Sequence, residues 1–303
     1  MKKNNANVVI VGISGESVFL ETDHFHRDGE TISAINKTTE PGGKGYNQAV
    51  ASSILGANVT YLTTVGDDVY GKYAVEYLKN KNINVKYRII DDIPTAYATI
   101  LTDKLGKNQV TVFSGASSYL NKTDVSLVEE DIKKADYVLL QFEVSKEVLM
   151  EVIRIAGENN VKVILNPAPA IYSINDELYH YVDILTPNEV EARDIFGIPE
   201  SLSVFEYGKY LQDRVKNIVV ITLGDKGCLL VKNNYYKYFE PVKVDAIDST
   251  GAGDVFNASL VTMLAYGYDI EEAIKFAVKV SAESVTKKYV MNAIDSLGKY
   301  KIN

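Results

Sequence analysis

The chain has 303 residues, of which 46% are hydrophobic and 24% charged, a composition typical of folded globular proteins. Its formal net charge of -8 argues against partners held by a general positive field, so neither nucleic acid nor an anionic membrane is expected to bind. No apolar run approaches the length of a membrane span, and a cytoplasmic location is therefore the default expectation. The lone Cys228 excludes an internal disulfide and is expected to be buried in a strand.

Short β-branched runs alternate with amphipathic stretches along most of the chain. This alternation predicts an α/β fold, with a Rossmann-like, mainly parallel sheet flanked by helices. We treat residues 1–303 as a single domain. The expected strands lie at residues 8–11, 59–65, 137–141, 161–165, 184–186 and 218–223. The expected helices lie at residues 47–55, 72–81, 146–158, 190–196, 204–213, 251–265 and 270–287.

Two segments, at about residues 14–40 and 95–113, depart from this alternation. Both show polar and apolar residues in turn, interrupted by turn residues at 27–29 and 103–106. This pattern predicts antiparallel strands that form a small inserted sheet. We expect the small sheet to act as a lid over the carboxyl ends of the parallel strands, where ligands of open α/β sheets bind.

The strongest local signal is the run Asp248-Ser249-Thr250-Gly251-Ala252-Gly253-Asp254, which leads into an apolar-periodic stretch. Small residues let a backbone approach its ligand closely, and amides at a helix N-terminus form an anion site. Asp254 is expected in the first helical turn, where it can point at the same spot. An ordinary helix start, with an acidic residue that complements the helix dipole, is equally compatible with this run alone.

A second glycine-rich run, Pro41-Gly42-Gly43-Lys44-Gly45-Tyr46-Asn47-Gln48-Ala49, also leads into a predicted helix. Three glycines around one lysine favour close backbone approach to a polar ligand. Taken alone, a flexible turn with a solvent-exposed lysine is slightly favoured. Two glycine-rich helix starts in one α/β chain are harder to dismiss.

Two further patterns are interpreted as structural. Residues 66–73 have the glycine and lysine spacing of a P-loop, but Tyr73 replaces the hydroxyl residue that would bind magnesium, so a turn before a helix is expected. His24 and His26 alternate as metal ligands on a strand would, yet no third histidine or cysteine lies near them. We interpret both as polar residues of the small sheet.

Five sequence blocks together resemble the ribokinase-like carbohydrate kinase family, also called the PfkB family. They are the two glycine-rich runs and the segments at residues 165–170, 186–191 and 221–227. Their order and spacing agree over nearly the whole chain. The resemblance implies an ATP-dependent kinase of a sugar or sugar-like small molecule, with a lid through which members frequently form homodimers.

The resemblance also implies residue roles. Asp254 is similar to the base that takes the proton from the attacking hydroxyl, and the amides of Gly251, Ala252 and Gly253 are similar to the hole that holds the transferring phosphate. Substrate contacts are implied for Gly43, Lys44, Asn47, Glu143 and Ser17. ATP contacts are implied for Asn188, Thr222 and Gly224, and a role in organising Mg²⁺ for Glu191.

The chain departs from the family pattern at two places. Members that phosphorylate ribose carry an Asn and an Asp after the first strand, where this chain has Gly15 and Ser17, so a carboxylate acceptor is lost unless Glu16 turns in. Ribose is therefore doubtful as the substrate. Residues 286–293 replace a segment that helps to bind a monovalent cation, which leaves K⁺ as an open question.

The expected function is thus transfer of the γ-phosphoryl group of ATP to a hydroxymethyl group of a pentose or hexose, with Asp254 as the base. Two alternatives stay open. A nucleoside or pseudouridine kinase would need an apolar or aromatic wall for the base. A catalytically idle ligand sensor is disfavoured, because a sensor has no need to keep a carboxylate aimed at an anion hole.

Overall fold

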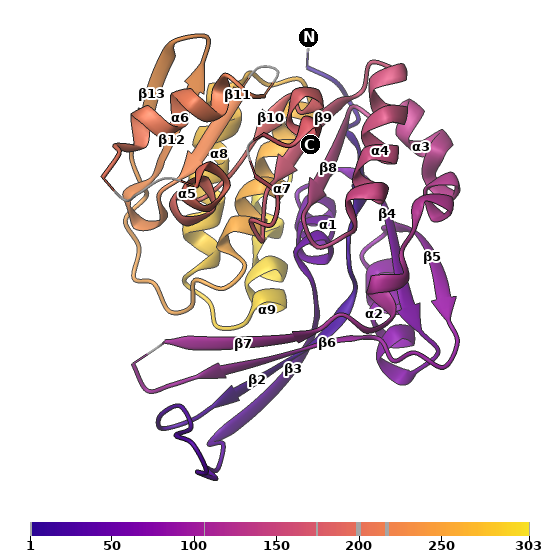
Figure 1. Cartoon of the computed structure of the whole chain (residues 1–303), viewed down its shortest axis with the longest axis vertical. Helices are drawn as coiled ribbons and strands as arrows, with labels where there is room; N and C mark the ends of the chain where they lie inside the picture. Colours follow the sequence, from indigo (N-terminus) through magenta and orange to yellow (C-terminus); the bar gives the residue numbers. More distant parts are fainter. Residues whose placement is uncertain (1, 106, 174, 198–200, 216–217, 303) are drawn as a thin grey trace.

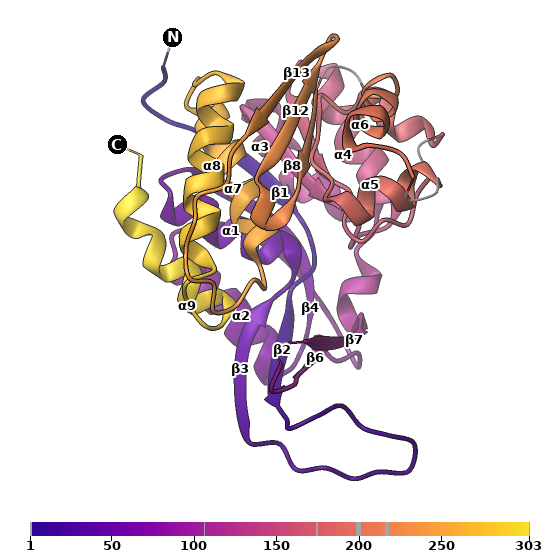
Figure 2. The same ribbon diagram turned by 90° about the vertical axis from the view of Figure 1, so that its left-hand side faces the viewer.

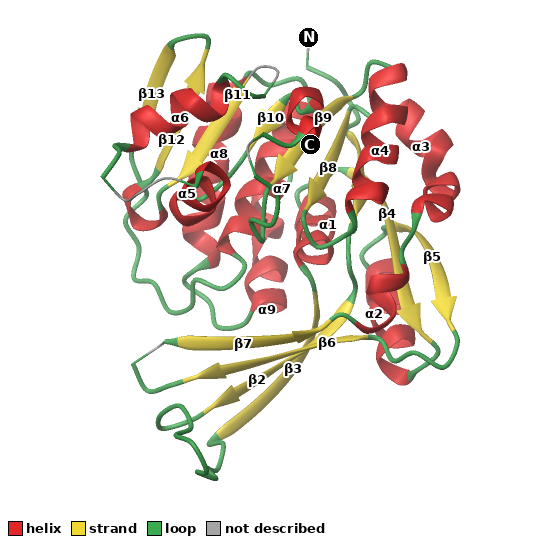
Figure 3. Ribbon diagram, in the orientation of Figure 1, coloured by secondary structure: helices red, strands yellow, loops and turns green. Residues whose placement is uncertain are grey.

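The computed structural model describes residues 2–105, 107–173, 175–197, 201–215 and 218–302. Within these residues the larger sheet has nine strands in the order β13-β12-β11-β10-β9-β8-β1-β4-β5 (Figures 1 and 3). Neighbouring strands are parallel from β11 to β5, whereas β12 and β13 are antiparallel additions at one edge. The strands are β1 (Asn7–Val11), β4 (Asn58–Gly66), β5 (Asn84–Ile90), β8 (Tyr137–Gln141), β9 (Lys162–Asn166), β10 (Ile184–Leu185), β11 (Ile218–Thr222), β12 (Cys228–Lys232) and β13 (Tyr235–Phe239).

Helices cover both faces of this sheet (Figure 2). One face carries α1 (Lys44–Ile54), α2 (Val69–Asn80), α7 (Ala252–Ala265), α8 (Ile270–Ser284) and α9 (Val290–Asp295). The other face carries α3 (Glu129–Lys134), α4 (Lys146–Glu158), α5 (Glu189–Phe196) and α6 (Val204–Gln212). None of the helices in the described part of the chain is long and apolar enough to cross a bilayer.

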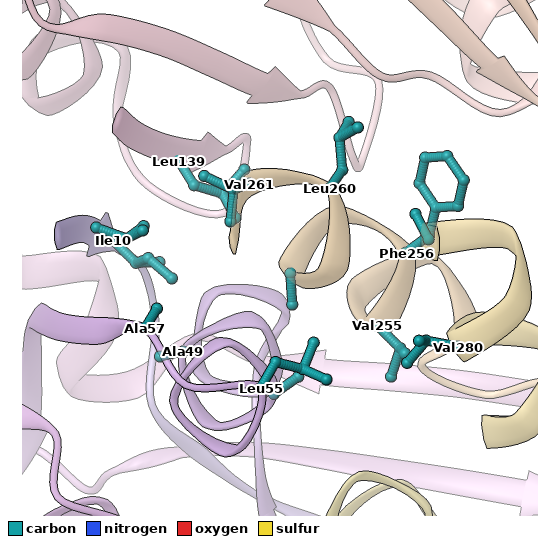
Figure 4. Packing of buried hydrophobic residues seen from close by; sticks show 14 of the residues in the cluster. Ile10, Ala49, Leu55, Ala57, Leu139, Val255, Phe256, Leu260, Val261 and Val280 are labelled. Atoms are coloured by element: carbon teal, nitrogen blue, oxygen red, sulfur yellow. The ribbon is translucent and has the colours of Figure 1, made fainter. Parts of the chain in front are cut away.

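The central strand β1 explains why the sheet needs both helical layers. Its side chains alternate between two hydrophobic cores: Val8 and Ile10 pack on the α1 and α7 side, while Val9 and Val11 pack on the α4 side. A strand buried on both faces requires a continuous apolar run, as the sequence has here. Figure 4 shows Ile10 beside Leu139 of β8, facing apolar side chains of α1 and α7.

The predicted α/β architecture is confirmed, and each expected strand and helix is present with ends shifted by a few residues. Four elements were not predicted. The edge strands β5 and β13 have mostly half-exposed or exposed residues, so their apolar pattern is weak. The helices α3 and α9 have six residues each, too few for a helical period to be recognised. Cys228 is buried in β12 as expected, and burial raises the pKa of its thiol to about 12.

The second sheet consists of two hairpins placed side by side, in the strand order β3-β2-β6-β7. Its strands are β2 (Gly15–Glu21), β3 (Asn36–Gly42), β6 (Ala96–Thr102) and β7 (Asn108–Phe113). Residues 103–105 of the predicted turn lie between β6 and β7, and Gly106 lies outside the described residues. We call these four strands the small sheet. Because β2 follows β1 after residues 12–14, the small sheet lies near the carboxyl ends of the parallel strands (Figure 1).

The expectation of antiparallel pairing in the small sheet was wrong at one place. The pairs β2–β3 and β6–β7 are antiparallel, as predicted, but β2 pairs with β6 in parallel. In each hairpin, the chain runs away from the main sheet along the first strand, which is β2 in one hairpin and β6 in the other. Because these two first strands lie next to each other, they must run in the same direction.

The segment with P-loop spacing forms the turn before a helix, as expected. Asp68 caps α2 by accepting a hydrogen bond from the Gly71 amide at 2.7 Å. It also accepts hydrogen bonds from the amide and the hydroxyl of Thr95, both at 2.7 Å. Burial opposes its charge, but these donors outweigh burial and lower the pKa of Asp68. One carboxylate therefore fixes both the start of α2 and the chain that enters β6.

We expect Asp68→Ala to reduce the free energy of unfolding by about 2 kcal/mol, since it removes a helix cap and two further hydrogen bonds. Urea denaturation at neutral pH measures this difference. Because the pKa is lowered by folding, the stabilisation exists above the ordinary Asp pKa of about 4 and is lost as the pH falls through the folded pKa. The neighbouring variant Asp67→Ala, which removes only an exposed ion pair with Lys72, should change stability little.

Candidate active site

Polar residues end four adjacent parallel strands and mark one edge of the main sheet. Gln141 ends β8, Asn166 ends β9, Thr186 follows β10 and Thr222 ends β11. The first three are almost completely buried. Because buried polar groups are normally hydrogen-bonded, we expect these side chains to take part in a hydrogen-bond network at this edge of the sheet.

The run 248–254 forms the start of α7 as predicted. Gly251 caps the helix with φ 78°, a left-handed conformation that disfavours side chains. The amide of Ala252 donates to the Ser249 carbonyl at 3.2 Å, so it closes the turn, which leaves the amides of Gly251 and Gly253 as the candidates for an anion. Gly253 is exposed, and apart from its chain neighbours a side chain there would meet no atom within 4 Å.

Asp254 is only 7% exposed and is held by two side chains of α1. Asn47 Nδ2 donates to one carboxylate oxygen at 2.8 Å, and Gln48 Nε2 donates to the other at 3.1 Å. Burial raises the pKa of Asp254, although Lys44 and the two amide donors act in the opposite direction. The two glycine-rich runs, about 200 residues apart, therefore meet at this carboxylate.

A buried hydrogen-bond chain continues behind Asp254 and was not foreseen from the sequence. Gln48 Nε2 also lies 3.2 Å from Asn166 Oδ1, and Gln141 Nε2 donates to Gln48 Oε1 at 2.5 Å. The sequence signal was present, because Gln48 directly follows Asn47, Gln141 ends a predicted strand and Asn166 directly follows another. The sequence did not indicate that Gln48, Gln141 and Asn166 lie within hydrogen-bonding distance.

A second branch connects the same strands to α7. Asn166 Nδ2 donates to the Thr186 carbonyl at 3.2 Å, and the Thr186 hydroxyl donates to Asn257 Oδ1 at 2.5 Å. Asn257 in turn donates to the carbonyl of Gly253 at 2.9 Å. The first turn of α7 is thus tied to the ends of β9 and β10.

Lys44 and Glu143 lie beside Asp254. The backbone amide of Lys44 donates to Glu143 Oε2 at 2.7 Å. Burial opposes the charge of Lys44, but the carboxylates of Asp254, Glu143 and Glu191 outweigh it and raise its pKa. Burial also raises the pKa of Glu143 to about 7, with Lys44 acting against the shift and Asp254 in its favour. One ammonium group thus compensates three carboxylates.

Gly43 and Ser17 lie where β3 of the small sheet meets α1. Gly43 has φ 123°, and a Cβ added there would collide with the carbonyl oxygen of Ile13. Ser17 on β2 points toward Gly42, since a Cβ on Gly42 would lie 2.5 Å from the Ser17 hydroxyl. Glu16 is buried on the opposite side of the strand. Burial raises its pKa, and the charges that act on it are Lys37 and Asp68, so it does not replace a carboxylate beside Lys44.

Asn188 and Glu191 form a capping box at the start of α5. Asn188 Oδ1 accepts the Glu191 amide at 2.8 Å, and Glu191 Oε2 accepts the Asn188 amide at 2.9 Å. Burial raises the pKa of Glu191, and Lys44 partly offsets this shift. Thr222 forms a bridge with Asn188. Gly224 starts the turn after β11 with φ 60° and open space around it, which suits close approach of a ligand.

The described residues contain no group of three or more His, Cys, Asp and Glu side chains that would hold a metal alone. Mg²⁺ commonly binds one or two carboxylates together with substrate phosphates, and the acidic cluster of Asp254 and Glu191 near Lys44 fits that mode. His24 does not belong to a cluster, because its Nε2 pairs with Glu30 at 3.0 Å in the loop after β2.

Asp248, in the region where a monovalent cation was left as an open question, is held by the protein itself. Both carboxylate oxygens of Asp248 already accept backbone amides, from Thr250 at 2.9 Å and from Tyr289 at 3.1 Å. Lys288 lies nearby: pairing with Glu21 raises its pKa, and the charge of Asp248 contributes to the same shift. Two backbone amides and the charge of Lys288 therefore act on Asp248.

Similarity to known proteins identifies the family and the fold of this chain. The family model for the pfkB family carbohydrate kinases matches residues 5–297. A ribokinase of Haemophilus influenzae is 34% identical over 294 residues, which cover 95% of this chain and 94% of the relative. A deoxyribokinase of Salmonella typhi is 29% identical over 301 residues, covering 97% of each.

The crystal structure of ribokinase from Thermotoga maritima resembles this chain with a TM-score of 0.86 and 35% identity, covering 97% of this chain and 99% of the other. The main sheet, its flanking helices and the small sheet together are the ribokinase-like fold. The predicted enzyme class, an ATP-dependent carbohydrate kinase, is confirmed. Over nearly its whole length, the chain belongs to the pfkB family of carbohydrate kinases.

Proposed function

We propose that this enzyme transfers the γ-phosphoryl group of ATP to a hydroxymethyl group of a sugar, with Asp254 as the general base. One observation carries the proposal: a buried carboxylate in the first turn of α7, directly after the exposed Gly253, is oriented by two amide donors of α1. A group that deprotonates a hydroxyl must be held within reach of it, and the burial that raises the pKa of Asp254 also strengthens it as a base.

Charge placement supports the same chemistry. Phosphoryl transfer needs little covalent help from the protein, so positioning and neutralisation of developing charge supply most of the catalysis. The amides of Gly251 and Gly253 would hold the transferring group at the helix N-terminus. Lys44, already surrounded by carboxylates, would help to neutralise the substrates when they enter.

We propose that ATP lies over the ends of β10 and β11, against Asn188, Thr222 and Gly224. The bridge between Asn188 and Thr222, together with the open backbone at Gly224, supports this placement. Mg²⁺ would be organised by Glu191, whose capping box fixes its side chain. The metal would supply charge neutralisation on the phosphates when bound.

The acceptor is proposed to be a pentose or hexose bound by Gly43, Lys44, Asn47, Glu143 and Ser17. Asn47 donates to Asp254 through Nδ2, while its buried Oδ1 has no partner among the described residues, so it can accept a substrate hydroxyl. The relatives named ribokinase and deoxyribokinase support a pentose. Ser17 and Gly15, which supply no carboxylate, and Glu16, which faces away, argue against ribose as the best substrate.

The first experiment measures ADP release with ATP and Mg²⁺ across ribose, 2-deoxyribose, fructose, other sugars, pseudouridine and purine nucleosides. We expect saturable turnover of one sugar other than ribose. In Asp254→Asn, kcat should fall about 10²–10⁴-fold because proton transfer is lost, while the fold is kept. The variant Asp245→Asn, in the exposed part of the loop before α7, is the matched control and should keep full activity.

Each other result has a definite meaning. Ribose as the best acceptor would show that a carboxylate at position 17 is dispensable, and preference for a nucleoside would favour the alternative class. Wild-type turnover by Asp254→Asn would exclude this residue as the base. Binding of ATP without turnover of any acceptor would favour a ligand sensor.

The pH dependence of acceptor binding tests the role of Glu143. Burial raises the pKa of the Glu143 carboxyl to about 7, and its ionised form is the stronger acceptor of hydroxyl hydrogen bonds. We expect the KM for the acceptor to rise as the pH falls through about 7. In Glu143→Gln the KM should be higher throughout and should lose this pH dependence; an unchanged profile in the variant would contradict the assignment.

We further propose that the small sheet is a lid within a single domain, and that two copies of the chain pair through it. All six residues of β7 are exposed, and Val110, Val112 and Phe113 are each more than half exposed. An exposed apolar edge strand is a liability unless it is covered. A cytoplasmic location, where ATP is available, agrees with this function.

Sedimentation velocity tests the pairing. We expect a dimer for the wild type and a shift to monomer for Val112→Asp, because a charge on β7 would be buried without a partner. The control Val242→Asp places the same charge on an exposed valine of the loop before α7 and should leave the dimer intact. A monomeric wild type at micromolar concentration would rule out the proposed interface.

A further inference from the structure

Residues 288–291, just before and at the start of α9, contact two parts of the site that are far apart in the sequence. One is the small sheet, and the other is the loop that leads into α7. Figures 1 and 2 both place α9 next to the small sheet, on the side of α7 and α8. We call residues 288–291 the clasp.

On the side of the small sheet, the clasp uses charge, hydrogen bonds and an aromatic contact. Tyr289 Oη accepts a hydrogen bond from Asn36 at 3.0 Å and donates one to Glu21 at 3.1 Å. The Tyr289 ring meets Phe19 of β2 edge to face, with 5.6 Å between the centroids. Lys288 forms an ion pair with Glu21.

Glu40 on β3 adds a buried connection. Its Oε2 accepts the amide of Val290 at 3.0 Å and the amide of Met291 at 3.2 Å, both at the N-terminus of α9. Burial raises the pKa of Glu40, and these amides act against that shift. A buried carboxylate without such donors would be costly, so β3 and the clasp are held together.

On the other side, the same residues contact the predicted anion site. The backbone amide of Tyr289 donates to Asp248, whose other oxygen holds the amide of Thr250. The side chain of Val290 packs so closely on Gly251 that an added Cβ would lie 2.8 Å from it. Asp248 and Gly251, the first and last residues of the segment 248–251, therefore both contact the clasp.

Tyr289 adopts a backbone conformation that favours glycine. Its φ of 69° lies in the left-handed region, which is uncommon for bulky side chains and persists only where the surroundings enforce it. Here they do so from two sides, because the backbone is bound by Asp248 and the side chain by Glu21, Asn36 and Phe19. A glycine would adopt this backbone without strain but would lose every side-chain contact.

We propose that the clasp couples the small sheet to the anion site, with Tyr289 as the positioning residue that holds the loop 248–251 in its anion-binding shape when the small sheet is seated. The inference rests on the proposed function, since it assumes that the acceptor binds beneath the small sheet and phosphate at α7. Binding of one substrate would then favour the site for the other through the protein, in addition to the contact between their reacting groups.

Hydrogen exchange followed by mass spectrometry tests the coupling without any substrate. Tyr289→Phe removes the bonds to Asn36 and Glu21 but leaves the backbone amide and the ring in place. We expect exchange in residues 248–253 to become about fivefold faster or more, the lower range of coupling between sites. Glu21→Gln should act in the same direction, and the double variant should add less than the sum of the two.

The control variant Tyr181→Phe changes an exposed tyrosine of the turn 177–181 and should leave exchange at 248–253 unaltered. Exchange in the core strand β8 should be unchanged in every variant, which separates loss of positioning from general loss of stability. Unchanged exchange at 248–253 in Tyr289→Phe would overturn the proposal, whether or not any sugar is phosphorylated.

Salt provides the second measurement. The backbone amides of Thr250 and Tyr289 already bind Asp248, and Lys288 supplies a positive charge nearby. Hydrogen exchange at residues 248–253 should therefore be the same in KCl and in NaCl at equal ionic strength. Specific protection by KCl would mean that a bound ion, not the clasp, holds the loop. The acceptor panel fails or succeeds independently of both measurements, so a wrong function and a wrong clasp would be distinguished.

Discussion

The structure depends on the burial of one carboxylate. Asp254 cannot stay ionised in an apolar interior unless donors and a positive charge replace water, and burial without them would cost several kcal/mol. Asn47, Gln48 and Lys44 supply this replacement. Because all three come from the start of α1, these polar contacts join α1 to α7 in addition to the apolar packing in Figure 4.

The same constraint extends into the sheet. Gln48 can orient Asp254 only if its own amide is held, which Gln141 and Asn166 do at the ends of β8 and β9. Such a network is stable only when every member is satisfied. In the part of the chain that the structure describes, the oxygens of Asn47 and Gln141 remain buried without a partner. Two acceptors of the network therefore remain open, and a polar substrate that reached the Asn47 oxygen would supply one of the missing hydrogen bonds.

Much of this was predictable from the sequence, for reasons that are local. Glycine beside a predicted helix start marked both Gly43 and Gly251, and apolar runs marked the buried strands. The sequence could not show which strands become neighbours in a sheet or in which relative direction they run. Nothing in residues 15–21 and 96–102 indicates that β2 and β6 run in parallel, because that depends on which strands become neighbours. The hydrogen bonds of Tyr289 could not be predicted from the sequence either, because a tyrosine with φ 69° changes neither the composition nor the hydrophobic periodicity.

The separation of Asn47 and Asp254 along the chain has a consequence for how the protein is made. The two residues are 207 positions apart in a chain of 303 residues, so more than half of the chain lies between them. Contacts of such sequence separation close late in folding, because the loop entropy must be paid before the contact is gained. During synthesis on a ribosome, β1 and α1 can pack while α7 is still missing. A growing chain that lacks α7 has no Asp254 for Asn47 and Gln48 to hold, so this part of the site is assembled only after α7 has been made.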